Sequence, residues 1–286
     1  MCVSVSVDLS YNRMFTPGDR LWGMRDIHFG ERILFRKRER RENVDKKIEY
    51  AEQWEVSSKY FYDKKYYNWM QKKIENYNAI LEVGCGTGYS TLALLENGHK
   101  VIALEKNNEC IKKATELIQQ KGYLVGKIPD ADVCFIETDV VTKEFYLGVL
   151  KDIQFDAVIC WNVGSYWDKE NVQFYLPYML EYGLNIDQIK ENVESSYGEL
   201  ILWNACKIAT MRNVPMHIIE RSSEIITELN CEYYCILGTE FGFSELEFDN
   251  LQADSISGGG RVLVTNGNVN MERIVDVILV SILMTF

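Results

Sequence analysis

The sequence predicts a doubly wound α/β fold, in which a mostly parallel seven-stranded sheet carries helices on both faces. Two observations predict it. From residue 79 onward, short apolar runs alternate with segments that have helical character, and the first apolar run leads directly into a glycine-rich turn. Strands that are joined through helices make right-handed crossovers, so they pair in parallel and their sheet is covered on both sides.

Two regions differ in composition. Residues 1–50 mix aromatic side chains with a charged run between residues 31 and 47, and we interpret them as a helical or irregular N-terminal cap. The charged run is either a solvated face or a basic cover over an anionic ligand or partner. Residues 51–286 are expected to form the α/β domain. Within it, the aromatic-rich segment 50–74 predicts one helix or two short ones.

The first half of the domain is regular. The apolar runs predict strands at 79–83, 101–104, 133–136 and 155–161. The segments between them predict helices at 90–96, 107–120 and 142–150. Asn107 or Asn108 is suited to cap the second of these helices, and Gly98 and Gly122 are placed to end the first and second.

The second half of the domain continues the alternation less regularly. The sequence predicts helices at 169–183, 187–195 and 216–229. It predicts the remaining three strands at 200–203, 233–237 and 275–284. Two further segments, 255–261 and 266–270, are rich in turn-forming residues.

Composition limits the classes of function. The chain has 286 residues, of which 47% are hydrophobic, and its formal net charge is −11. This composition is typical of folded globular proteins and excludes wholesale disorder. Because an acidic surface repels phosphate backbones, we do not expect nucleic acid as a partner.

The eight cysteines are scattered singly through predicted strands and helices. No Cys-x-x-Cys pair occurs, so we predict neither a metal site nor a disulfide framework, and we interpret the cysteines as reduced thiols. The N-terminus lacks the pattern of a signal peptide. The longest apolar stretch, residues 277–284, is far shorter than the roughly 20 residues that cross a bilayer. We therefore expect a cytoplasmic protein without a membrane segment.

The most informative segment is Glu82-Val-Gly-Cys-Gly-Thr-Gly88, which follows a predicted strand and precedes a predicted helix. Open parallel sheets bind ligands at this position, outside the carboxyl ends of the strands. Glycine lacks the Cβ that would hold a ligand away from the backbone. The spacing of Gly84, Gly86 and Gly88 differs from the G-x-G-x-x-G of dinucleotide-binding loops, and an acid precedes it.

This loop resembles the first motif of the class I S-adenosylmethionine-dependent methyltransferases. The resemblance covers residues 50–205 well and the remainder loosely. It implies that Glu82, Gly84, Gly86 and Gly88 contact the amino-acid end and the ribose of the cofactor. A carboxylate at Glu82 suits the cofactor's ammonium group, whereas it would be out of place beside a pyrophosphate.

Two further acids stand where the resemblance requires them. Glu105 directly follows the second predicted strand, and the resemblance implies that it accepts both ribose hydroxyls; the same position also suits the ribose of a nicotinamide cofactor. Asp139 follows the third predicted strand, and by resemblance it accepts from the adenine amino group, with Val140 against the ring. Alone, each acid is also explained as a helix N-cap or a first-turn charge. Together, the three acids Glu82, Glu105 and Asp139, at three successive strand ends beside the glycine loop, favour a cofactor site.

The side of the site that would receive the methyl group is less defined. By resemblance, Asn162 at the end of the fourth predicted strand lies beside the sulfonium and the acceptor. The segment Asn162-Val-Gly-Ser165 lacks the Asn/Asp-Pro-Pro-aromatic motif of enzymes that methylate nucleic-acid amino groups. Candidate catalytic residues are His217, as a general base, and Tyr166, as part of the acceptor pocket; His217 is alternatively a surface or helix-start histidine.

The sequence therefore predicts S-adenosylmethionine-dependent methyl transfer, with a small molecule as the expected acceptor. A protein or peptide methyltransferase, a catalytically silent cofactor-binding module and a nicotinamide oxidoreductase are the alternatives. We predict no metal site. The pattern does not identify the acceptor or the oligomeric state.

Overall fold

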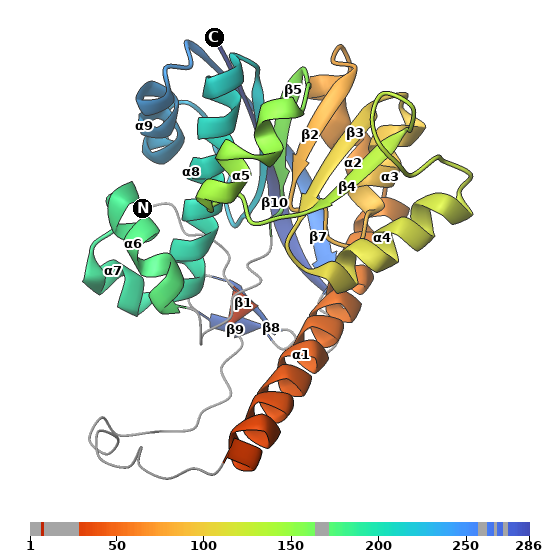
Figure 1. Cartoon of the computed structure of the whole chain (residues 1–286). Coiled ribbons are helices and arrows are strands. Elements are labelled where there is room, and N and C mark those ends of the chain that lie inside the picture. The colour runs from red at the N-terminus through yellow and green to blue at the C-terminus, as the bar shows by residue number, and fades with distance from the viewer. Residues whose placement is uncertain (1–6, 9–28, 164–171, 257–261, 266–267, 271–273) are drawn as a thin grey trace.

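The computed structural model describes residues 7–8, 29–163, 172–256, 262–265, 268–270 and 274–286 (Figure 1). Its main feature is a seven-stranded sheet with the order β4-β3-β2-β5-β6-β10-β7. The strands are β2 (Ala79–Val83), β3 (Lys100–Glu105), β4 (Val133–Glu137), β5 (Ala157–Trp161), β6 (Met216–Ser222), β7 (Glu245–Ile256) and β10 (Ile274–Thr285). Only β10 runs antiparallel to its neighbours, β6 and β7. The predicted mostly parallel, seven-stranded fold is confirmed.

Strands β2, β3 and β4 follow one another toward one edge of the sheet. After β4 the chain crosses back to β5, which lies on the other side of β2, so the strand order reverses between β2 and β5. Parallel sheets form a crevice at such a switch point, at the carboxyl ends of the strands. A second, three-stranded sheet consists of β1 (Val7–Asp8), β8 (Val262–Thr265) and β9 (Asn268–Asn270).

Helices cover both faces of the large sheet (Figure 1). They are α1 (Phe29–Asp63), α2 (Tyr66–Gln71), α3 (Tyr89–Glu96), α4 (Asn108–Gln120), α5 (Lys143–Leu147), α6 (Val172–Tyr182), α7 (Ile186–Glu191), α8 (Val193–Arg212) and α9 (Glu232–Phe241). Short 3-10 helices follow α2 at Lys72–Ile74 and α5 at Val149–Asp152.

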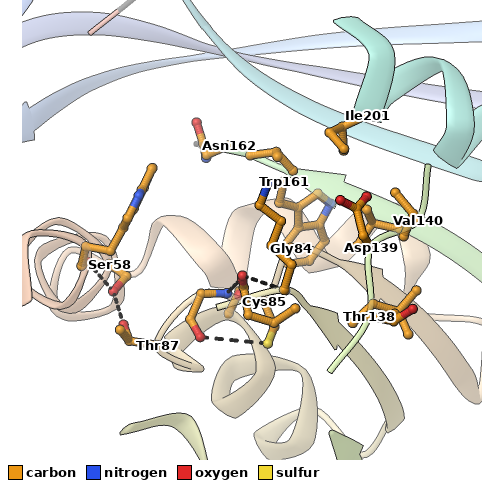
Figure 2. A pocket seen from close by; sticks show the side chains of 18 of the residues that line it. Ser58, Gly84, Cys85, Thr87, Thr138, Asp139, Val140, Trp161, Asn162 and Ile201 are labelled. Atoms are coloured by element: carbon orange, nitrogen blue, oxygen red, sulfur yellow. Dashed lines mark hydrogen bonds between the residues drawn. The ribbon is translucent and has the colours of Figure 1, made fainter. Parts of the chain in front are cut away.

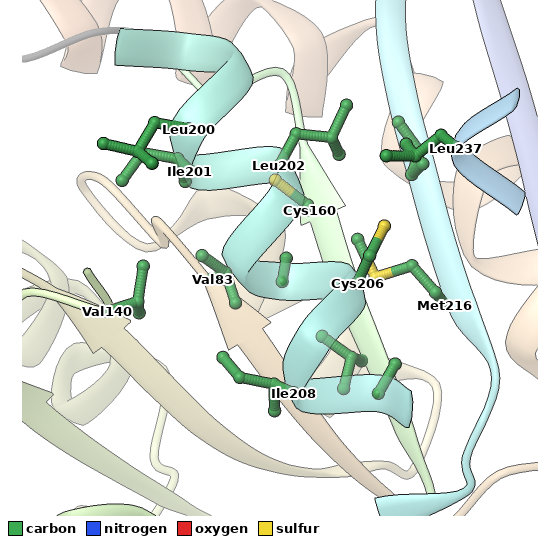
Figure 3. Close-up of a cluster of buried hydrophobic side chains, with 14 of the residues drawn as sticks. Val83, Val140, Cys160, Leu200, Ile201, Leu202, Cys206, Ile208, Met216 and Leu237 are labelled. Carbon is green, nitrogen blue, oxygen red and sulfur yellow. The ribbon is translucent and has the colours of Figure 1, made fainter. Parts of the chain in front are cut away.

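Two hydrophobic clusters lie against opposite faces of the sheet, because successive strand residues point to opposite sides. Leu81 of β2 belongs to the cluster under α8, and its neighbour Ile80 belongs to the cluster under α3. Figure 3 shows Leu202 and Cys206 of α8 beside Cys160 of β5. The central strands are therefore buried on both faces.

Three predictions in the second half of the domain are wrong. Residues 200–203, predicted as a strand, lie inside α8, and residues 233–237, also predicted as a strand, lie inside α9. The predicted helix 216–229 begins instead as strand β6, and β7 at 245–256 was not predicted at all. Helix α8 is buried along most of its length, so its apolar run lacks the helical spacing that would distinguish it from a strand.

Helix α1 continues without a break across residue 50, the predicted boundary between cap and domain. Helix α1 contacts α4 and the residue that caps it: Lys113 pairs with Glu55 of α1 at 2.6 Å, and the Asn107 Nδ2 donates to the backbone oxygen of Lys47. The proposal that residues 1–50 act as a cap stays a prediction. No helix among the described residues is both long and apolar enough to cross a membrane. The seven cysteines in the described ranges are free thiols.

Candidate functional site

The glycine-rich loop lies at the switch point, between β2 and α3. The amides of Gly84 and Cys85 donate to the backbone oxygen of Leu104 at 2.8 and 3.2 Å, which fastens the loop to β3. Gly88 has a φ of +85° and begins α3. The loop borders a pocket that opens to solvent.

The pocket is lined by residues from the ends of four strands and from α1 and α8 (Figure 2). Predicted site residues in its wall are Gly84, Gly86, Glu105, Asp139, Val140 and Asn162. The structure therefore places these predicted residues, which follow or end β2, β3, β4 and β5, in the wall of one pocket. The other two predicted residues of the motif, Glu82 and Gly88, do not line the pocket. Glu82 is in β2, and Gly88 is the N-cap residue of α3.

Glu105 ends β3 and receives three backbone N–H groups. Its Oε2 accepts from Gly86 at 3.0 Å, and its Oε1 accepts from Lys106 at 2.8 Å and Asn107 at 2.9 Å. Burial raises the pKa of this carboxyl group, and the three amides oppose that rise. The carboxylate is thus held rigidly between the glycine loop and the start of α4, with one side in the pocket.

Glu82 does not reach the pocket wall, which corrects the expectation that its carboxylate meets a ligand's ammonium group. The side chain is 2% exposed and lies beneath the loop. Ser90 and Thr91, in the first turn of α3, donate their hydroxyls to it, the latter at 2.6 Å. Burial raises the pKa of Glu82 to about 7, against the lowering effect of the two hydroxyls. Its role is to tie α3 to β2.

Asp139 and Val140 follow β4 at the far side of the pocket. Tyr175 of α6 donates its hydroxyl to Oδ2 of Asp139, and the amide of Val141 donates to Oδ1 at 3.1 Å. Val140 is buried against the cluster under α8. The acid therefore presents a carboxylate edge to the pocket while α6 fixes its orientation.

Asn162 directly follows β5 and has a left-handed conformation, with a φ of +47°. Its Oδ1 accepts a hydrogen bond from Nε of Arg221 at 3.2 Å. Its Nδ2 is buried and has no hydrogen-bond partner in the structure. A buried donor without a partner is uncommon and costs roughly 1–3 kcal/mol, so it marks a place where a ligand or water is expected.

His217 is not placed to act as a base, which corrects its candidacy. It lies within β6, fully buried, and does not line the pocket. Trp161 donates its indole N–H to Nδ1 at 3.1 Å, so the neutral ring carries its proton on Nε2 and donates to the Ser281 hydroxyl at 2.8 Å. Burial lowers the pKa of His217 to about 3. Tyr166 lies outside the described residues.

Sequence reasoning did not single out any aromatic residue of the segment 50–74 for the site, although a few of its aromatic side chains were candidates for the acceptor pocket. Tyr50, Trp54 and Tyr67 line the pocket, whereas others pack between helices. Ser58 also lines it and shares a 2.8 Å hydrogen bond with Thr87 of the glycine loop (Figure 2). Tyr197 and Ile201 come from α8, which the sequence did not predict as one helix.

Lys106, directly after Glu105, is a further missed residue of the pocket wall. Its ammonium group donates to Tyr197 at 2.7 Å and to Tyr175 at 3.1 Å, and it lies over both rings. Its position in sequence, next to a predicted site acid, was the one available signal. The two tyrosines belong to α8 and α6, whose approach to β3 only the fold reveals.

Residues 80–181 match a family described as a methyltransferase domain, Methyltransf_25. The matched segment, which carries the glycine loop, Glu105, Asp139 and Asn162, is a methyltransferase domain. No curated protein matches its sequence.

Solved structures similar to this methyltransferase include a precorrin 8W decarboxylase of Methanobacterium thermoautotrophicum, at 18% identity and a TM-score of 0.39, covering 73% of this chain and 81% of that chain. A magnesium protoporphyrin IX methyltransferase of Synechocystis PCC 6803 with bound S-adenosylmethionine has 12% identity and a TM-score of 0.39, covering 92% and 88%. The N-terminal domain of EvdMO1 with bound S-adenosylhomocysteine has 18% identity and a TM-score of 0.41, covering 77% and 79%. At these identities and TM-scores, none identifies a substrate.

The residues of the pocket fit S-adenosylmethionine, the cofactor that the resemblance of the glycine loop implies. A Cβ added at Gly86 would meet no atom within 4 Å, so the loop backbone borders open space that a ligand is able to fill. Bound S-adenosylmethionine supplies an already activated methyl group. The protein's task in such a displacement is to align the two reactants and to exclude water.

Proposed function

We propose that this methyltransferase transfers the methyl group of S-adenosylmethionine to a small-molecule acceptor. The observation that carries the proposal is the single pocket in which the glycine loop, Glu105, Asp139 and Asn162 meet the aromatic side chains of α1. The net charge of −11 argues against a nucleic-acid acceptor.

We assign the cofactor contacts by their position. Glu105 would accept the ribose hydroxyls, because its carboxylate is fixed between the loop and α4 with one side in the pocket. Asp139 and Val140 would hold the adenine from the end of β4. Gly84 and Gly86 would let the backbone approach the cofactor, while Glu82 and Gly88 hold the loop in place from behind.

The aromatic wall would serve the reacting end of the cofactor. Trp161 stacks on Tyr67 with an interplanar angle of 16°, and both side chains line the pocket together with Trp54. Aromatic faces attract cations, and they exclude water from the place where the methyl group moves. No histidine is among the described residues that line the pocket, so the proposal relies on the acceptor's own nucleophilicity and on alignment.

The proposal is tested by calorimetric titration with S-adenosylmethionine, S-adenosylhomocysteine and NADH. We expect the first two to bind and NADH not to bind. Glu105→Ala should weaken both by at least tenfold. Glu137→Ala is the matched control, since Glu137 pairs with Glu105 across β3 and β4 but is exposed and outside the pocket. Equal losses in the two variants would contradict the assignment of Glu105.

Turnover separates an enzyme from a silent binding module. Purified protein with S-adenosylmethionine and a set of small-molecule hydroxy, amino and carboxy compounds should form S-adenosylhomocysteine above the rate without acceptor. Acidic peptides, added in parallel, test the protein or peptide alternative. Cofactor binding with no product from any acceptor would favour the silent module.

A further inference from the structure

An exposed apolar surface lies on α9 and on the turn that precedes it, and none of its residues lines the pocket. Leu229 has 98% of its surface exposed, and Ile225 and Ile236 have 59% and 57%. Ile236 comes four residues after Glu232 in α9, so the two share the outer face of that helix. Exposed apolar side chains that gather among polar ones are typical of protein–protein contact sites.

The turn that carries Leu229 is held rigidly, so the exposure of this side chain is built into the fold. Oδ1 of Asn230 accepts from the amide of Thr227 at 2.7 Å, and its Nδ2 donates to a backbone oxygen of the same turn at 2.8 Å. Ile226 is buried beneath the turn, and the side chain of Asn250 in β7 bonds both its amide and its backbone oxygen. A side chain on a fixed backbone loses little conformational freedom when a partner binds.

The same surface is strongly acidic. Residues 222–260 contain eight aspartates and glutamates and no lysine or arginine. Glu224, Glu228 and Glu232 are exposed, and within the described ranges none of the three forms an ion pair. Together with the three apolar side chains they form a surface that we call the α9 face: Glu224, Ile225, Glu228, Leu229, Glu232 and Ile236. A complementary partner presents positive charges around apolar side chains.

The chain itself carries such a segment at the start of α1. Residues 31–47 hold eight basic and four acidic residues, with the apolar run Ile33-Leu34-Phe35 among them, and they are helical. Figure 1 shows this end of α1 extending beyond the sheet, at the opposite end of the molecule from α9. The segment therefore does not reach the α9 face of its own copy. Between two copies, the contact can form twice about a two-fold axis.

We propose that the α9 face binds the basic segment 31–47 of a second copy of this chain, so that the protein forms a two-fold dimer. The glutamates of the face pair with lysines and arginines of the segment, and Leu229 packs among its apolar side chains. Helix α1 continues from this segment to Tyr50 and Trp54 in the pocket wall, so each copy steadies the helix that borders the pocket of the other. The inference depends neither on the cofactor nor on the acceptor.

Sedimentation velocity of the full chain tests the self-association. At about 20 mM salt we expect a dimer, and at about 1 M salt, where charges are screened beyond roughly 3 Å, the dissociation constant should rise at least tenfold. Leu229→Ser should raise it at least tenfold at low salt. Leu147→Ser is the matched control, since Leu147 is 79% exposed on α5 and outside the α9 face. A wild type that stays monomeric at low salt, or equal behaviour of the two leucine variants, overturns the inference.

Charge reversal tests which segment occupies the face. Glu228→Lys with Glu232→Lys makes the α9 face basic, and Arg36→Glu with Arg40→Glu places acidic side chains in the segment. Each doubly substituted protein should be monomeric alone, because neither keeps the attraction between face and segment. An equimolar mixture of the two should form the dimer again, because both contacts of the mixed pair are complementary.

Thermal unfolding followed by circular dichroism should match the wild type in every variant, which separates loss of the dimer from loss of the fold. A mixture that stays monomeric overturns the assignment of segment 31–47. A monomeric wild type that binds polyarginine also overturns the inference, because the α9 face then takes a basic partner other than this chain.

Discussion

Gly88 offers the sharpest test of how the glycine loop is built. It begins α3 with a φ of +85°, and it faces α4 at close range. A Cβ at this position would stand 2.7 Å from Cβ and 2.9 Å from Cα of Ala114. Because the second of these atoms is backbone, no side-chain rotation relieves the contact. Gly88→Ala must therefore shift α3 against α4.

The expected loss has two parts. A left-handed backbone costs an L-residue about 1–2 kcal/mol, and overpacking of a close helix contact costs about 1–3 kcal/mol. The sum for Gly88→Ala is about 2–5 kcal/mol. Gly98, just after α3, is the matched control, since its φ is +88° and a Cβ there meets nothing within 4 Å. Gly98→Ala should cost only the first part.

Urea unfolding followed by circular dichroism measures both variants against the wild type. We expect the free energy of unfolding to fall by at least 1 kcal/mol more in Gly88→Ala than in Gly98→Ala, with unchanged slopes against urea concentration. Equal losses would refute the reasoning, because they would show that the approach of α4 imposes nothing on position 88 beyond its backbone conformation.

Three further predictions concern buried polar groups. Burial raises the pKa of Glu82 from 4.5 to about 7, so the protonated side chain stabilises the fold below pH 4.5 and this stabilisation is lost toward pH 7. In urea melts at successive pH values, the unfolding free energy of the wild type, relative to that of Glu82→Gln, should therefore fall by about 3 kcal/mol over this range. For His217, whose pKa is lowered from 6.5 to about 3, stability is present above pH 6.5 and is lost as the pH falls; relative to His217→Gln, the wild type should lose about 2 kcal/mol by pH 4.5, and parallel pH profiles would contradict this. Ser58→Ala leaves the buried Thr87 hydroxyl without its partner, so we expect a loss of about 1 kcal/mol in stability and weaker binding of S-adenosylhomocysteine by calorimetry.

The first four strands of the sheet were predictable because each is a short apolar run bounded by clear turn residues. Asn107 caps α4 as predicted, with its side chain accepting from the amide of Glu109. Gly98 and Gly122 stand just beyond the ends of the first two helices. Local signals were sufficient here, since the glycine loop fixes where β2 ends and the helix begins.

The second half was not predictable in the same way. Helix α8 and strand β6 are both buried among other elements, so neither shows the one-sided pattern that identifies its type. Strand β7 does alternate, with Leu246 and Phe248 between Glu245, Glu247 and Asp249. Its high charge gave it the composition of a loop, although it lies at the edge of the sheet, where such charges are common.

The same contrast holds for the site. Gly86, Glu105 and Asp139 are adjacent to predicted strand ends, and all three line the pocket. Arg221 and Tyr197 reach the site from elements that were assigned to the wrong class, so their convergence depends on tertiary packing. Glu82, in contrast, was predicted as a pocket residue but does not line the pocket. Its position in the motif does not reveal that Ser90 and Thr91 donate their hydroxyls to its carboxylate.

Trp161 gives the molecule an optical property. Its indole is only 5% exposed, its N–H is bonded to a neutral His217, and its ring stacks on Tyr67 at the pocket wall. Such an indole should fluoresce at short wavelength, and its emission should change when a ligand replaces solvent beside it. Occupancy of the pocket is therefore expected to be visible in the unlabelled protein, and comparison with Trp161→Phe separates the response of Trp161 from that of Trp54, which also lines the pocket.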